Sequence, residues 1–86
     1  MPRVSAFYGI LIYMYFSEHG LPHFHAVYGD SEAAISLRGQ RVLDGSLPAR
    51  ALALVRFWAR LHQTELETNW SLARAGRPLR PIAPLE

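Results

Sequence analysis

The feature that most constrains the fold is a change in the period of apolar residues near residue 46. Before this point, short apolar stretches rich in Ile, Val and aromatic residues are separated by Gly and Asp, which is typical of strands and turns. After it, apolar residues recur at the i, i+3, i+4 and i+7 spacing of a helix that buries one side. Strands followed by helices, without alternation, predict an α+β fold.

The N-terminal half predicts three to four antiparallel strands between about residues 10 and 43. The expected segments are residues 10–16, 23–28, 32–37 and, as a short fourth strand, 41–43. The links between them are short and contain Gly20, Gly29 and Gly39. Because a short link joins antiparallel neighbours, we expect a meander.

The C-terminal half predicts two helices between about residues 48 and 75, both packed on one face of the sheet. Ser46 is suited to the N-cap and Pro48 to the first turn of the first helix. The apolar stripe of this helix consists of Ala51, Leu52, Leu54, Val55, Trp58 and Leu61. Thr64 and Glu67 have the spacing of a capping box, so the second helix is expected to begin at Thr64.

An extended tail is expected over residues 77–86, a segment that contains three prolines. Leu79, Ile82 and Leu85 recur at every third position of this segment. We therefore expect the tail to dock on the body of the protein.

Length and composition bound the class of protein. The 86 residues predict a single domain, 1–86, and the absence of cysteine excludes disulfides and thiolate metal sites. Half of the residues are hydrophobic, so we expect a homo-oligomer such as a dimer, or a cognate small protein partner, to cover apolar surface. The apolar run over residues 10–16 is shorter than the roughly twenty residues that cross a membrane, which predicts a cytoplasmic protein without membrane contact.

Positive charge is concentrated in the second half of the chain. All nine basic residues are arginines, and six of them lie within residues 46–86. This distribution suits nucleic acid or an acidic partner, and a solvated surface also accounts for it. Arg56 and Arg60 lie four residues apart on the first predicted helix, with no acidic residue between Asp44 and Glu65, a spacing that favours a nearby anion.

Three of the four histidines, His19, His23 and His25, lie in the string HGLPHFH within residues 18–25, the candidate site. Imidazole is a common metal ligand, so the three side chains are candidate ligands of a divalent metal such as zinc. Glu18, Asp30 or Glu32 would complete that site. The alternative is a structural role in which the imidazoles form hydrogen bonds or face solvent.

The same histidines also suit acid–base catalysis on a phosphodiester. One of His23 and His25 would act as the base and the other as the acid, with Arg56 or Arg60 holding the phosphate. All three readings of the histidines, metal, catalytic and structural, remain open from residue types alone.

Strand alternation predicts where the histidine pair points. His23, His25 and Val27 share one face, whereas Phe24, Ala26 and Tyr28 share the more apolar face that should pack on the helices. The pair should then lie beside Tyr13 and Tyr15 of the first predicted strand, forming a surface for a substrate or partner on the outer side of the sheet. His62 falls within the apolar stripe of the first helix, where a histidine is usually a core residue with one hydrogen-bond partner.

The chain resembles the bacterial domain-of-unknown-function 4160 family over most of its length. The matching pieces are MPRVSAFYGILIYMYF, EHGLPHFHAVYG, LPARALALVRFWARLHQTELETNW and PLRPIAPLE. The family pattern H-x-P-P-H-F-H fits His19, Pro22, His23, Phe24 and His25, while Leu21 replaces the first proline. His62 matches a histidine of the family's helix.

The resemblance implies a genetic setting more than an activity. Genes of the family are often described beside that of a second small family, domain of unknown function 2442, in a layout similar to toxin–antitoxin pairs. It therefore implies that this chain is one half of such a module, either the toxin or the antitoxin, with a ribonuclease-like activity if it is an enzyme. The alternative is a metal-binding module or a non-catalytic protein-interaction module.

Overall fold

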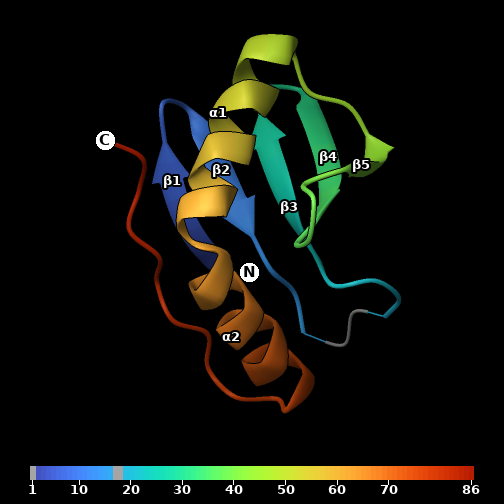
Figure 1. Ribbon diagram of the computed structural model, residues 1–86, viewed down its shortest axis with the longest axis vertical. Helices are drawn as coiled ribbons and strands as arrows, with labels where there is room; N and C mark the ends of the chain where they lie inside the picture. Colours follow the sequence, from blue (N-terminus) through green and yellow to red (C-terminus); the bar gives the residue numbers. More distant parts are fainter. Residues whose placement is uncertain (1, 17–18) are drawn as a thin grey trace.

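The computed structural model, which describes residues 2–16 and 19–86, has five strands followed by two helices (Figure 1). The elements are β1 Arg3–Phe7, β2 Ile10–Tyr13, β3 His23–Tyr28, β4 Ser31–Ser36, β5 Val42–Gly45, α1 Ala49–Leu61 and α2 Gln63–Arg74. The strands form one antiparallel sheet in the order β1-β2-β3-β4-β5. The α+β prediction is confirmed, whereas the predicted number of three to four strands is wrong because the sheet has five.

The strand missing from the prediction is β1, which lies before the expected start of the sheet at residue 10. A two-residue turn, Tyr8–Gly9, joins it to β2, and both residues have positive φ, 51° and 78°. Positive φ at both central residues belongs to the tight hairpin turns that Asn-Gly usually forms. Because a tyrosine occupies the first position here, the hairpin carried no recognisable turn signal.

The expected strand over residues 10–16 is shorter in the structure. It ends at Tyr13, and the backbone N–H of Met14 instead donates to the carbonyl of Pro2. The strand over residues 23–28 has the predicted limits.

One face of the sheet, called the inner face here, forms the core with the helices. Its buried residues are Phe7, Ile10, Ile12, Phe24, Ala26, Ala33 and Ile35. Tyr28, which was expected to pack on the helices, pairs with Ile10 on this face but is 41% exposed. Trp58 of α1 is fully buried, and its ring lies 5.3 Å from that of Phe7 and 5.9 Å from that of Phe24 between ring centroids. Figure 1 shows α1 crossing the sheet and α2 continuing past its end.

The helix limits agree with the predicted range, but their ends differ in detail. Pro48 itself occupies the N-cap of α1, and α2 begins at Gln63 with His62 as its N-cap; neither cap residue forms a side-chain cap hydrogen bond. Leu61, expected in the apolar stripe, is 60% exposed, whereas Ala59 is buried. The buried stripe of α1 is therefore rotated toward Ala51, Val55, Trp58 and Ala59.

The C-terminal tail docks as expected and runs beside β1 (Figure 1). Ile82 is buried, and its N–H donates to the carbonyl of Val4 over 2.7 Å. The indole of Trp58 donates to the carbonyl of Ala83, and the buried side chain of Asn69 both donates to and accepts from the backbone of Arg80. These bonds attach the tail to both helices. In the described part of the chain, neither helix combines the length and apolarity that crossing a bilayer requires.

Candidate functional site

The second face of the sheet, called the outer face here, carries the predicted histidine and tyrosine side chains. Strand pairing places one row of residues side by side across all five strands: Arg3, Tyr13, His25, Ala34 and Asp44. A second row consists of Ala6, Leu11, Val27 and Glu32. Directly paired residues project on the same side of a sheet, so both rows share the outer face. None of these nine residues is buried.

His23 and His25 lie side by side on this face, as strand alternation predicts. Their ring centroids are 5.1 Å apart, and the rings of His25 and Tyr15 form an edge-type contact with centroids 4.8 Å apart. Tyr13 and Tyr15 are stacked, with centroids 6.1 Å apart. The structure thus brings four of the predicted site residues into one continuous cluster of rings.

Two polar contacts orient the imidazoles. The Nδ1 atom of His23 lies 2.7 Å from the carbonyl oxygen of Leu21, and because a carbonyl only accepts, this nitrogen carries the proton. The Nδ1 atom of His25 lies 3.7 Å from a carboxylate oxygen of Glu32. Each ring is therefore held by a different partner, which gives the two imidazoles different surroundings.

His23 also reaches a part of the molecule that the sequence did not associate with it. Its ring centroid lies 5.3 Å from that of Trp70, a buried residue of α2. His23 therefore lies at the end of the outer face, where α2 extends past the sheet, whereas His25 lies near the middle of that face.

The predicted metal ligands that lie among the described residues are not grouped as a metal site. His19 is exposed in the connection before β3. Among residues 2–16 and 19–86, no three His, Asp or Glu side chains are grouped so that they could hold a metal ion. Glu18, one of the acids predicted to complete the site, lies outside the described residues.

The predicted phosphate contacts, Arg56 and Arg60, lie on α1 and so on the opposite side of the sheet from His25. The Nε–H of Arg56 donates to the carbonyl of Gln40 over 3.0 Å, which gives this arginine a structural contact with the β4–β5 connection. Arg60 is exposed beside Arg38 at a shallow hollow between that connection and the helices. The structure does not bring either arginine to the histidine pair.

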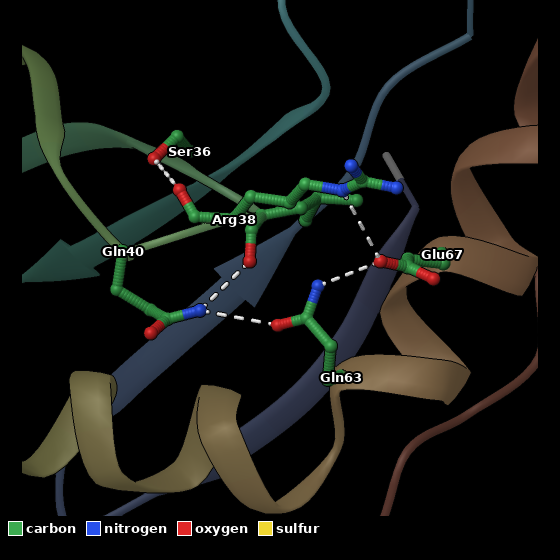
Figure 2. Close-up of polar contacts among 6 residues, drawn as sticks. Ser36, Arg38, Gln40, Gln63 and Glu67 are labelled. Atoms are coloured by element: carbon green, nitrogen blue, oxygen red, sulfur yellow. Dashed lines mark hydrogen bonds and ion pairs between the residues drawn. The ribbon is translucent and has the colours of Figure 1, made fainter.

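A polar network joins the β4–β5 connection to the helix junction (Figure 2). Gln40 is buried, and its side-chain amide donates to the carbonyl of Leu37 at 2.7 Å and to the side-chain oxygen of Gln63 at 3.1 Å. Gln63 in turn donates to Glu67, which also lies 3.8 Å from Nε of Arg38. This network holds the helical layer against the sheet.

His62, which the apolar stripe predicted to be a core residue with one hydrogen-bond partner, is located at the junction of the two helices. Its side chain is 17% exposed, its Nδ1 atom pairs with the carboxylate of Glu65, and its ring lies 5.5 Å from that of Trp58. These contacts account for His62 as a structural residue.

Sequence reasoning missed two charged members of the outer face, Arg3 and Asp44. They occupy the two ends of the row that contains His25, on the first and last strands. Arg3 was overlooked because β1 was not predicted. Asp44 was missed because the strand was expected to end at residue 43. Strict alternation would also place Asp44 on the same face as Val42, and only the register shift at Ala34/Ile35 brings it beside Ala34 on the outer face.

The fold and the outer face define a small α+β protein whose sheet has one covered and one uncovered face. The model of the family described as Domain of unknown function (DUF4160) matches residues 9–71, and the chain belongs to this family. No curated protein and no solved structure matches the chain.

Proposed function

We propose that this protein is a protein-binding module, one half of a two-gene pair of toxin–antitoxin type, and that the outer face is its contact surface. The observation that carries the proposal is the contrast in burial between the two faces of one sheet. Most inner-face residues, among them Phe24, Ala26 and Ile35, are buried, whereas none of the nine residues in the two outer rows is. An apolar and aromatic surface left uncovered by its own chain is typical of a protein-interaction site.

The residue types on the outer face support a protein partner. Leu11 and Val27 are half-buried neighbours in the middle strands, beside the rings of Tyr13 and Tyr15. Aromatic residues are enriched in protein interfaces, where the centre is apolar and the rim polar. Here Arg3 and Asp44 supply charge at the rim.

The test is substitution at the centre of the outer face. Val27→Glu should remove association, both of the chain with itself and with the product of the neighbouring gene, measured by co-purification and light scattering. Ala53→Glu, on the exposed side of α1, is the matched control and should leave association unchanged. Circular dichroism should show both variants folded. Wild-type protein that associates with neither chain, or association that survives Val27→Glu, contradicts the proposal.

A second candidate is a ribonuclease-like activity at the same face. The observation that favours it is the pair of imidazoles 5.1 Å apart, with Glu32 beside His25 and Arg3 in the same row. His25, oriented by Glu32, would accept a proton from the attacking hydroxyl, His23 would protonate the leaving oxygen, and Arg3 in place of Arg56 and Arg60 would contact the phosphate.

This activity predicts that expression of the chain alone arrests growth and that purified protein cleaves RNA. His25→Ala should remove both effects, whereas His62→Ala, at the helix junction, should retain cleavage in folded protein. A wild-type chain without cleavage, or cleavage that survives His25→Ala, excludes the activity. A partner bound to the outer face would also block it, so the protein-binding role and the activity are linked.

A further inference from the structure

We propose that the partner of the outer face is a second copy of this chain, packed sheet against sheet about a two-fold axis that runs parallel to the strands along β3. This inference rests on the protein-binding role proposed above and names its partner. It is carried by the order of residues in the row Arg3, Tyr13, His25, Ala34 and Asp44.

The first argument is charge. A two-fold axis along the central strand places β1 of one copy opposite β5 of the other, so that Arg3 faces Asp44 of the partner subunit twice across the interface. Within residues 2–16 and 19–86, neither Arg3 nor Asp44 has an ion pair. Stacked sheets lie about 10 Å apart, a gap that an arginine and an aspartate can bridge.

The second argument is shape. The same axis places Tyr13 opposite Ala34 of the partner subunit. Ala34 borders a hollow of about 280 Å³, lined also by His25, Glu32 and Asp44. A large ring on β2 therefore faces a recess on β4, once in each direction, which is the interdigitation that packed sheets require.

The charges also select the axis. An axis running across the strands, along the row itself, would place Arg3 against its own copy and Asp44 against its own copy. Like charges in direct contact across an interface cost several kcal/mol. Only the axis along β3 turns both ends of the row into attractive contacts.

The dimer would change the site as well as cover it. His25 occupies the centre of the row, so the imidazoles of both copies would meet at the axis. Each copy would contribute one His25 to a shared group, flanked by the Tyr13 rings and by Glu32 of each copy. The histidine site would then belong to the pair of chains.

The experiment is a charge exchange in the full chain, read by analytical ultracentrifugation. Wild type should be a dimer, and Arg3→Asp or Asp44→Arg should each raise the dimer dissociation constant roughly tenfold or more. The double variant Arg3→Asp/Asp44→Arg should restore it to near the wild-type value. Arg77→Asp, at an exposed position three residues after the end of α2, is the matched control and should leave the dissociation constant unchanged.

A second variant addresses the recess. Ala34→Arg should fill it and give a folded monomer, whereas Ala53→Arg on the exposed side of α1 should remain dimeric. A monomeric wild type that still binds the neighbouring gene product through Val27 overturns this inference and leaves the proposed function intact. The inference is also overturned if Arg3→Asp/Asp44→Arg does not restore dimerisation, or if the Ala34→Arg variant remains a dimer.

Discussion

The two faces of the sheet are built from alternate residues of the same strands, yet their side chains are buried to different extents. In β3, Phe24 and Ala26 are fully buried, while the alternating residues His25 and Val27 are half-buried. The difference arises because α1 and the tail pack on the inner face, whereas α2 meets the outer face at its His23 end, through Trp70. The chain thus covers one face with its own C-terminal half and leaves the other for something else.

The comparison separates residues that the fold needs from residues that function needs. Fully burying a side chain the size of Phe or Ile stabilises a protein by about 1.5–3 kcal/mol, so fully buried side chains such as Phe24, Ile35 and Trp58 contribute strongly on the inner side. The outer positions gain less from folding, and polar residues would serve equally well there. Leu11, Val27 and the two tyrosines are therefore explained better by a contact surface than by stability.

The sharpest way to break this comparison uses two adjacent alanines of β4. Ala33 is buried on the inner face and Ala34 half-buried on the outer face. Ala33→Arg would place an unpaired charge in the core and should cost more than about 4 kcal/mol, enough to unfold a small domain. Ala34→Arg should keep the native fold. Circular dichroism and urea denaturation distinguish them, and two variants of equal stability would refute the division into faces.

A smaller effect is expected at the network that holds the helical layer over the inner face. Gln40→Ala removes the hydrogen bonds to Leu37 and Gln63 and should lower the free energy of unfolding by about 1–2 kcal/mol. Glu32→Ala, on the outer face, should change it by less than about 0.5 kcal/mol. Urea titration measures both changes in the free energy of unfolding. A larger decrease for Glu32→Ala than for Gln40→Ala would contradict the assignment of Gln40 to the inner side and Glu32 to the outer face.

The smallest effect is expected at a polar atom on the inner face. Ser5 is buried, and its hydroxyl has no hydrogen-bond partner in the described part of the chain. Ser5→Ala should therefore be neutral or stabilise the protein by up to about 1 kcal/mol, because burying an unsatisfied hydroxyl is costly. Ala6→Ser, the next residue and exposed on the outer face, should have no measurable effect. Thermal denaturation measures both variants. A loss of stability in Ser5→Ala would contradict the prediction, because it would mean that the Ser5 hydroxyl has a hydrogen-bond partner.

Local patterns were sufficient for most elements of the fold. Alternation over residues 23–28 located β3 and divided its two faces, and helical spacing located α1 and α2 within a few residues. The same alternation predicted that His23 and His25 lie beside Tyr13 and Tyr15. These predictions succeeded because each depends only on residues near one another in the chain.

Two features were not predictable, one of them local and the other dependent on distant segments. The hairpin of β1 depended on a tyrosine with positive φ, and Trp70 reached His23 only because α2 extends past the sheet.

The sequence by itself determined the α+β class and which side chains share a face, because period and turn chemistry are local. Only the tertiary structure decided that Arg3 and Asp44 stand at the two ends of the His25 row, that Arg56 supports a loop, and that the outer face stays uncovered. Those outcomes depend on strand register and on where the helices pack, which no single segment of the chain specifies.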